Sequence, residues 1–188
     1  MPEPLQNYID DHIALAKAVG QKLLPQIELA ARTIIDSLAS GGKILTFGNG
    51  GSAADAQHFA AELSGRYVRD RRALAAFSLT TDTSVLTAVG NDFGFDEVFS
   101  RQVAAHVRAG DIVVGITTSG NSKNVIAGII EAKKRGAKAI ALLGCDGGKA
   151  KDLADVAIVI PSNVTARSQE MHILVIHMIC ELVDRWAA

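Results

Sequence analysis

The sequence contains little cysteine, proline or aromatic character, and almost no net charge. Of its 188 residues, 2 are cysteines, 4 are prolines and 5% are aromatic, and the formal net charge is -1. Two cysteines far apart in the sequence exclude a disulfide-stapled scaffold, so we expect both thiols to be reduced and packed as small apolar side chains. A nearly neutral chain also lacks the strong positive field that typically draws a protein to nucleic acid or to an anionic membrane. We therefore expect neither partner.

Long apolar runs are missing as well. The N-terminal segment MPEPLQNYIDDH is acidic, and the apolar runs further along are short and end at glycine or at a charged residue. A transmembrane helix needs about 20 apolar residues, and a secretory signal needs an apolar segment close to the N-terminus. The sequence therefore predicts a cytoplasmic protein with no membrane segment.

What the sequence does contain is an alternation of short apolar runs and amphipathic stretches. Apolar residues recur every three or four positions up to about residue 40, which predicts two N-terminal helices. Apolar runs predict five strands near residues 43–47, 75–79, 111–116, 138–143 and 156–160. Strands that are apolar throughout and alternate with helices indicate a parallel sheet covered on both faces. We therefore predict one α/β domain over residues 1–188, with a doubly wound five-stranded parallel sheet in flavodoxin-like order, two leading helices, and a long closing helix.

Two turns rich in glycine or hydroxyl groups follow predicted strands. The segment TTSGNS (117–122) places four hydroxyls at a helix N-terminus, where free N–H groups and the helix dipole favour an anion such as phosphate. Ordinary helix capping is the alternative, although it explains only one or two of these hydroxyls. The segment GNGGSA (48–53) would let the backbone approach a small ligand closely, or it is simply a tight turn. Because ligands bind beyond the carboxyl ends of such strands, we expect both turns to line one site.

The segment GNGGSA also partly matches the glycine fingerprint of dinucleotide-binding domains. That fingerprint requires an acidic residue about 20 residues further on, at the end of the second strand. Asp70 stands at roughly that distance, but it belongs to the charged run RDRR (69–72), which we interpret as an exposed loop. Nucleotide binding is therefore the less favoured interpretation.

Candidate acid–base or metal-binding residues fall on two predicted helices. His58 and Glu62 are four residues apart and therefore share a helix face, although a surface ion pair would explain them equally. On the closing helix, Gln169 and His177 lie on one slanted row. Glu170 competes with Gln169 for a functional role because glutamate is the more usual metal ligand. Spacing alone leaves these alternatives open.

Taken together, these motifs resemble the phosphoheptose isomerases, a branch of the sugar isomerase (SIS) domain family. The resemblance covers nearly the whole chain. It is carried by GNGGSAADAQHFAAELSGRY (48–67), VGNDFGFDEVFSRQV (89–103), TTSGNSKNVI (117–126), GCDGGK (144–149) and TARSQEMHILVIHMICELVD (165–184). The hydroxyl loop alone is typical of the SIS family in general. The His58/Glu62 and Gln169/His177 elements are typical of the heptose branch.

This resemblance implies an aldose–ketose isomerase that converts D-sedoheptulose 7-phosphate to D-glycero-D-manno-heptose 7-phosphate, the first step of activated heptose biosynthesis for lipopolysaccharide and other surface glycans. It also implies a homotetramer with active sites between subunits, packed in part by the helices of residues 1–40, and one zinc ion per subunit. The implied acid–base pair is Glu62 and His177. The implied zinc ligands are His58, Glu62, Gln169 and His177. The implied substrate contacts are Asn49, Gly50, Gly51, Ser52, Glu62, Arg66, Asn91, Asp92, Thr117, Thr118, Ser119, Ser122 and Gln169.

Two alternative functions remain within the same family. One is a non-catalytic SIS protein that binds the replication initiator DnaA, in which case the helix around Asn124 would be a candidate partner surface. That relative lacks the equivalents of Glu62 and His177, whereas this chain has both. The other alternative is an isomerase of a different sugar phosphate, because the hydroxyl loop recognises phosphate and says little about chain length. One departure from the family pattern is Ala166, at a position where some members carry an acid.

Overall fold

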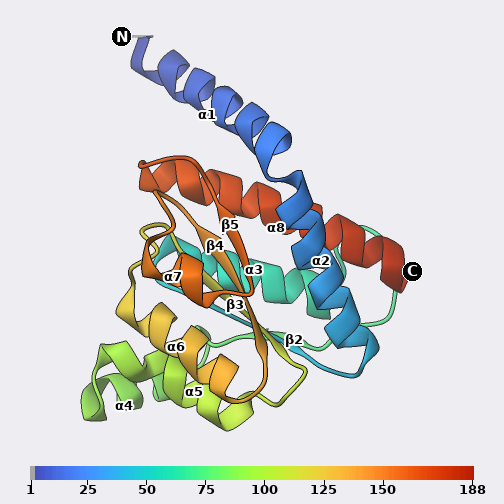
Figure 1. Cartoon of the computed structure of the whole chain (residues 1–188), viewed down its shortest axis with the longest axis vertical. Helices are drawn as coiled ribbons and strands as arrows, with labels where there is room; N and C mark the ends of the chain where they lie inside the picture. Colours follow the sequence, from blue (N-terminus) through green and yellow to red (C-terminus); the bar gives the residue numbers. More distant parts are fainter. Residues whose placement is uncertain (1–2) are drawn as a thin grey trace.

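The computed structural model describes residues 3–188, so residues 1 and 2 of the predicted helical segment lie outside it. The chain forms one five-stranded sheet surrounded by helices (Figure 1). The strands are β1 (Ile44–Gly48), β2 (Ala76–Ser78), β3 (Ile112–Thr117), β4 (Lys138–Leu143) and β5 (Val156–Val159). The helices are α1 (Glu3–Lys22), α2 (Leu24–Ala39), α3 (Gly51–Ser64), α4 (Thr83–Asp92), α5 (Val98–His106), α6 (Lys123–Lys134), α7 (Gly148–Leu153) and α8 (Thr165–Ala187), with a short 3-10 helix η1 at Phe95–Glu97.

All strands of the sheet are parallel, in the order β2-β1-β3-β4-β5. This order confirms the predicted flavodoxin-like topology, and it reverses between β1 and β3. At that junction Gly48 at the end of β1 pairs with Ile116 of β3. The two turns that leave these strands therefore start side by side, at the position where open α/β sheets bind ligands.

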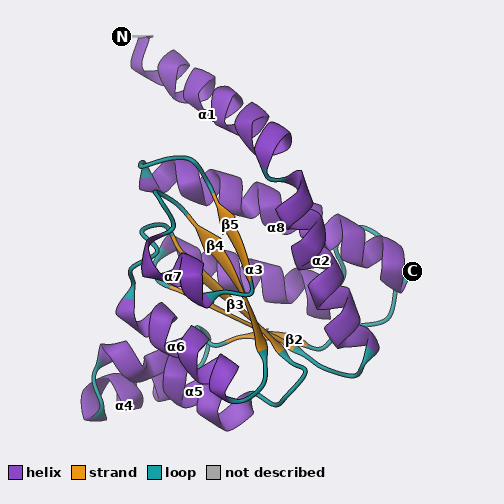
Figure 2. Ribbon diagram, in the orientation of Figure 1, coloured by secondary structure: helices purple, strands orange, loops and turns teal. Residues whose placement is uncertain are grey.

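Helices cover both faces of the sheet (Figure 2). Side chains of the strands alternate between two apolar layers, one on each face. One layer joins strand residues such as Ile44 and Ile112 to α2, α3 and α8. The other joins Leu45 and Val113 to α5, α6 and α7. Because α3 and α8 belong to the same layer, side chains on their shared boundary can meet although they are more than a hundred residues apart.

The segment between β2 and β3 is helical, whereas no element was predicted there. Helix α4 has no fully buried residue, so it lacks the continuous apolar stripe that identifies a helix from periodicity. Gly90 and Gly94 interrupt the pattern further. The predicted turn at 144–148 is also followed by the short helix α7. No helix among the described residues is both long and apolar enough to cross a bilayer.

Helix α8 carries a histidine in the interior of the protein. His172 is 0% exposed, and its Nε2 donates a hydrogen bond of 3.0 Å to the carbonyl oxygen of Leu143 at the end of β4. Its other ring nitrogen is buried with no partner among the described residues. Burial lowers the pKa of His172 from 6.5 to about 4, although the bond to Leu143 opposes the shift. His172 is therefore a neutral core residue.

We expect this histidine to make folding sensitive to mild acid. In the unfolded chain His172 binds a proton below about pH 6.5, whereas in the folded chain it stays neutral until about pH 4. Stability that is fully present above pH 6.5 is therefore lost as the pH falls from 6.5 toward 4. The loss should reach about 2 kcal/mol between pH 7 and pH 5. Urea unfolding of wild type and His172→Met at both pH values checks this. An equal pH dependence in the two proteins would contradict it.

Candidate active site

The two predicted turns line one small polar cavity at the junction of β1 and β3. Its volume is about 270 Å³. Its lining includes eight residues predicted as substrate contacts, together with Ile116 and Thr165: Asn49, Gly50, Gly51, Ser52, Thr117, Thr118, Ser122 and Gln169. The cavity is open to solvent and its walls are mostly small side chains and backbone. Its hydroxyl and backbone groups suit a phosphate, and its volume leaves room for one.

Two glycines of the β1–α3 turn shape the site, one through its backbone conformation and one through a close side-chain contact. Gly50 has φ 56° and ψ -123°, a conformation that side-chain-bearing residues rarely adopt. At Gly51 an added Cβ would lie 2.6 Å from the amide nitrogen of Gln169. The turn therefore lets the N-terminus of α3 contact the side chain of Gln169 directly. His58 lies about two helical turns further along α3.

The hydroxyl-rich loop does not simply cap its own helix. Ser122 is the N-cap residue of α6, yet its side chain makes no capping hydrogen bond. Instead its hydroxyl lies 2.9 Å from that of Thr117, which is also 3.4 Å from the hydroxyl of Ser119. Clustered hydroxyls beside an uncapped helix N-terminus form a binding site for an anion. The capping alternative is thus a poor explanation for this loop.

A second group of predicted residues meets on the facing sides of α3 and α8. Nε2 of His58 lies 2.9 Å from a carboxylate oxygen of Glu62 and 3.4 Å from Nε2 of His177. The three candidate ligand atoms of these residues all lie within 4.8 Å of one another. We call these three residues the His–Glu–His cluster. Spacing predicted the pair on α3, and packing of α8 supplies the third member.

The donor set of the His–Glu–His cluster fits zinc. Two imidazoles and one carboxylate are a common zinc-binding combination, and it leaves a coordination position open. Nε2 of His177 lies 3.4 Å from Nε2 of His58, so one cation could bind both ring nitrogens and the carboxylate of Glu62. The cluster is partly exposed, with side-chain exposure of 43% for His58 and 21% for Glu62, so a small ligand can reach it.

A half-buried acid, Asp55, lies one helical turn from the cluster. Burial raises the pKa of Asp55 from 3.8 to about 6, while the charge of His58 lowers it. Oxygen Oδ2 of Asp55 is buried and lacks a hydrogen-bond partner among the described residues. This acid was not predicted, although its position three residues before His58 places it on the same side of α3.

The structure separates Gln169 from Glu170. Gln169 lines the polar cavity, whereas Glu170 faces α1, where an oxygen lies 2.7 Å from Nδ1 of His12 and the other accepts from Arg167. Arg167 also stacks on the ring of Tyr8. Glu170 therefore ties α1 to α8, and Gln169 is the member of this pair in position to meet a ligand.

Five predicted substrate contacts lie outside the cavity lining. Glu62 belongs to the His–Glu–His cluster, and Ser119 lies in the hydroxyl-rich loop beside Thr117. Arg66 is exposed in the segment after α3, and Asn91 and Asp92 are exposed at the end of α4, where their side chains hydrogen-bond each other at 2.8 Å. Helix α4 belongs to the opposite side of the sheet from α3 and α8 (Figure 1). Within one chain Asn91 and Asp92 therefore do not meet the His–Glu–His cluster.

Two interpretations of surface residues need correction. The run 69–72 is a loop in which Asp70 and Arg72 are exposed as predicted, but the side chain of Arg71 is 1% exposed and pairs with the fully buried Asp184 of α8. A short charged run gives no sign of a buried partner far along the chain. Asn124, considered as a partner contact, is 3% exposed. Asp70 precedes β2 rather than following it, which removes the acidic ribose ligand of a nucleotide site.

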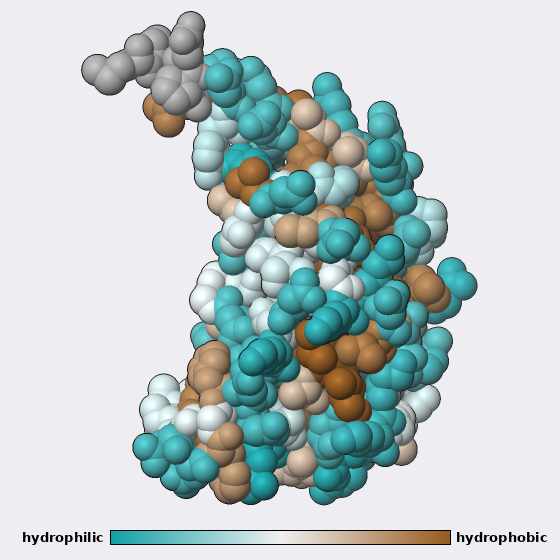
Figure 3. Space-filling view, turned by 60° about the vertical axis from the view of Figure 1, so that its left-hand side comes forward, coloured by the Kyte–Doolittle hydropathy of each residue, from teal (hydrophilic) through white to brown (hydrophobic). Residues whose placement is uncertain are grey.

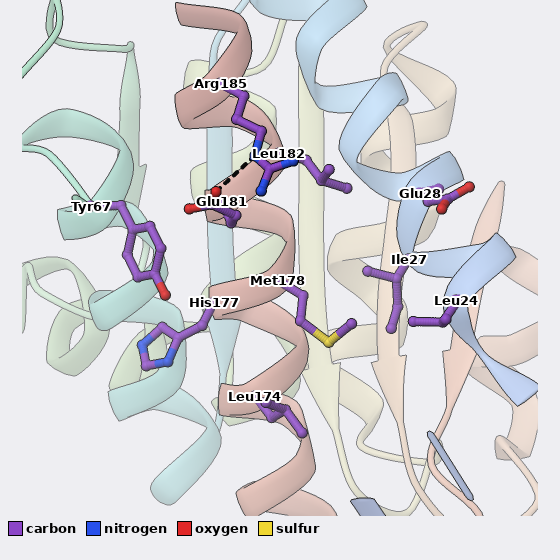
Figure 4. A pocket seen from close by; sticks show the side chains of 10 residues that line it. All are labelled: Leu24, Ile27, Glu28, Tyr67, Leu174, His177, Met178, Glu181, Leu182 and Arg185. Atoms are coloured by element: carbon purple, nitrogen blue, oxygen red, sulfur yellow. Dashed lines mark hydrogen bonds and ion pairs between the residues drawn. The ribbon is translucent and has the colours of Figure 1, made fainter. Parts of the chain in front are cut away.

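A larger, apolar groove of about 490 Å³ lies beside the cluster, between α2 and α8. Figure 4 shows Leu24 and Ile27 of α2 on one side and Met178 on the other, with His177 and Tyr67 at one end. The ring of Tyr67 lies 5.4 Å from that of His177. Apart from His177 the groove contains no predicted site residue, so it borders the cluster without belonging to the polar cavity.

A family model, curated relatives and solved structures all relate this chain to the same family. The model of the SIS domain family matches residues 7–144. Phosphoheptose isomerase from Geobacter sp. (strain M21) is 52% identical over 185 residues, covering 98% of this chain and 96% of that protein. The structure of phosphoheptose isomerase from Neisseria gonorrhoeae superimposes with a TM-score of 0.94 at 48% identity and covers 98% of both chains. The enzyme from Francisella tularensis gives a TM-score of 0.94 at 36% identity.

Proposed function

The chain belongs to the SIS domain family and, within it, to the phosphoheptose isomerases, and on this basis we propose that it converts D-sedoheptulose 7-phosphate to D-glycero-D-manno-heptose 7-phosphate. It is a sugar-phosphate isomerase that acts in heptose biosynthesis. The observation that carries this proposal is the placement of an acid–base cluster on α3 and α8 beside a hydroxyl-lined cavity suited to phosphate. We also propose that the enzyme works in the cytoplasm.

The isomerisation moves one proton between neighbouring carbons. Glu62 removes a proton from C1 of the ketose, which leaves an enediolate, and returns a proton to C2 to form the aldose. His177 transfers a proton between the oxygens, from O1 to O2, so the overall reaction is balanced. One carboxylate oxygen of Glu62 faces His58, so the other can accept the carbon-bound proton. The polar cavity holds the phosphate and thereby fixes C1 and C2 at the cluster.

We propose that one zinc ion per subunit binds to His58, Glu62 and His177, with Gln169 as a further ligand. The ion would polarise the substrate carbonyl and stabilise the charge that develops on its oxygen. The ligand atoms of the His–Glu–His cluster converge on one point, which supports the proposal. Gln169 would connect this point to the cavity. Without the ion, Nε2 of His58 orients the carboxylate of Glu62; with the ion bound, that nitrogen and the carboxylate would both be held by the ion instead.

We further propose a homotetramer with active sites between subunits. Apolar side chains of α1 are exposed, including Leu5 and Ile9, and apolar side chains gather in patches on the surface seen in Figure 3. The apolar groove beside His177 also continues the cluster toward the molecular surface. Asn91 and Asp92 lie away from the cluster of their own chain, so they would act as substrate contacts in a neighbouring subunit.

The proposal is tested by proton NMR of the purified protein with sedoheptulose 7-phosphate in D₂O. We expect new aldose anomeric signals. They should disappear after chelation, with metal removal verified by elemental analysis, and return when zinc is added. Full activity of the metal-free protein would remove zinc from the mechanism. No turnover with zinc present, together with turnover of fructose 6-phosphate, would instead identify an isomerase of a shorter sugar.

A catalytic role is favoured over binding of the replication initiator alone. A protein released from catalysis has no need to keep both Glu62 and His177, and in this chain the two side chains also meet through His58. If no sugar phosphate is converted, a binding assay with DnaA becomes the next experiment.

A further inference from the structure

The polar cavity has a side-chain bridge between the two turns that line it. Asn49 follows β1, and Asn124 is the second residue of α6, after the hydroxyl loop of β3. The amide nitrogen of Asn49 donates to the amide oxygen of Asn124 at 2.8 Å, and the amide nitrogen of Asn124 donates back to the oxygen of Asn49 at 2.9 Å. The two turns are therefore joined by a closed pair of hydrogen bonds.

This bridge engages the polar atoms of both side chains. The oxygen of Asn124 accepts a further hydrogen bond from the backbone N–H of Val125 at 2.9 Å. Asn124 is buried, with only 3% of its surface exposed. Rotation of either amide by half a turn would place donor against donor and acceptor against acceptor. The pair therefore holds a single orientation, and each amide nitrogen keeps its second N–H, so Asn49 is fixed by Asn124 and can still donate to a ligand in the cavity.

We propose that Asn124 is a positioning residue, which acts through Asn49 to set the distance between the glycine turn and the hydroxyl loop of the cavity. This inference rests on the proposed role of that cavity in holding phosphate. It adds a positioning role to Asn49, which lines the cavity and stays a predicted substrate contact. A phosphate that must contact both turns binds tightly only if the turns are already at the right separation, because otherwise binding has to order them.

The bridge should affect anchoring of the phosphate and leave proton transfer alone. Asn49 and Asn124 lie in the cavity wall and beneath it, whereas the acid–base groups lie further along α3 and α8. Loss of the bridge should therefore weaken binding of inorganic phosphate and raise KM for the sugar phosphate. The kcat at saturating substrate should stay within about twofold of wild type, since a uniform loss of binding raises KM alone.

The test compares Asn49→Ala, Asn124→Ala and the double variant by calorimetric titration with inorganic phosphate, which needs no turnover. We expect each single change to weaken phosphate binding about tenfold, and the double variant to resemble the singles, because either change breaks the same bridge. Circular dichroism confirms folding. If Asn124→Ala does not fold, Asn49→Ala and Asn124→Asp, which retains the acceptor for Val125, provide the comparison, with Asn121→Asp as the charge control in the same loop.

Three results would overturn the proposal. Wild-type phosphate affinity in a folded single variant would show that the bridge does not position the turns. A hundredfold loss in the double variant would show two independent contacts. A lowered kcat with unchanged KM would place the pair in the chemical step. These outcomes are separate from failure of the proposed reaction, since phosphate affinity can be measured on a protein that does not convert sedoheptulose 7-phosphate.

Discussion

Replacement of Glu62 by glutamine is expected to lower kcat by about two to four orders of magnitude, the usual contribution of a positioned general base. Glutamine has the same shape and can still accept a hydrogen bond from His58, which lies 2.9 Å from the carboxylate in the wild type. It cannot take up a proton from C1. The change should therefore remove the base while the α3–α8 packing and the phosphate cavity stay intact, and KM should change little.

The matched control is Glu170→Gln, the same chemical change on the adjoining helix. Glu170 contacts His12 and Arg167 and lies away from the cluster, so its replacement should retain most of the activity. Steady-state kinetics and exchange of the C1 proton with D₂O measure both variants. If Glu62→Gln keeps kcat within tenfold of wild type, another group removes the proton, and the assignment of the base is wrong.

Replacement of Asp184 by alanine is expected to cost about 3 to 5 kcal/mol of stability, the range measured when one member of a buried ion pair is removed. Asp184 is 0% exposed and Arg71 1%. The carboxylate also accepts hydrogen bonds from the backbone N–H groups of Val68 and Arg69 at 2.9 and 2.8 Å. Burial alone would raise the pKa of Asp184, but these bonds and Arg71 hold it below its usual value.

Loss of this carboxylate leaves a buried guanidinium and two N–H groups without their partner. Because Arg71 also donates to the carbonyl oxygens of Glu62 and Leu63 at 2.8 and 3.1 Å, the end of α3 that carries Glu62 should loosen as well. Urea unfolding at one fixed protein concentration measures the effect. Glu181→Gln is the control. Glu181 lies on the same helix as Asp184, and its ion pair with Arg69 is about one third exposed, so this pair should contribute less than about 1 kcal/mol. Equal losses in the two variants would contradict the assignment.

Much of the fold could be predicted because its periodicity is local. Strand β4 lies where the apolar run 138–143 placed it, and the other strands differ by one residue at one or both ends. Helix α4 was missed because it has no buried residue, and α5 was missed because its 9 residues are too few for a clear helical period. Local pattern reports burial along one element, so an element that rests against its neighbours by partial contacts leaves little trace in the sequence.

The site could be predicted less evenly. Spacing on one helix placed His58 beside Glu62, and the two glycine- and hydroxyl-rich turns were expected at one site because parallel strands end at one edge. Two contacts were not foreseen because their residues are far apart in the sequence. Asn49 and Asn124 are 75 positions apart, and Arg71 and Asp184 are 113 positions apart. Such pairs depend on three-dimensional packing, and the identity of a single residue does not indicate its partner.

The division of the site between turns and helices has a consequence for redesign. The His–Glu–His cluster is mounted on α3 and α8, which are fixed by the apolar layer beneath them, whereas the phosphate cavity is formed largely by two turns at the sheet edge. Substitutions in the turns can therefore retune which sugar phosphates are accepted while the proton-transfer groups keep their geometry. A library at residues 118, 119 and 121, which leaves out Gly120 because a side chain there would overlap the backbone of Gly147, should change KM for the sugar phosphate with little loss of kcat.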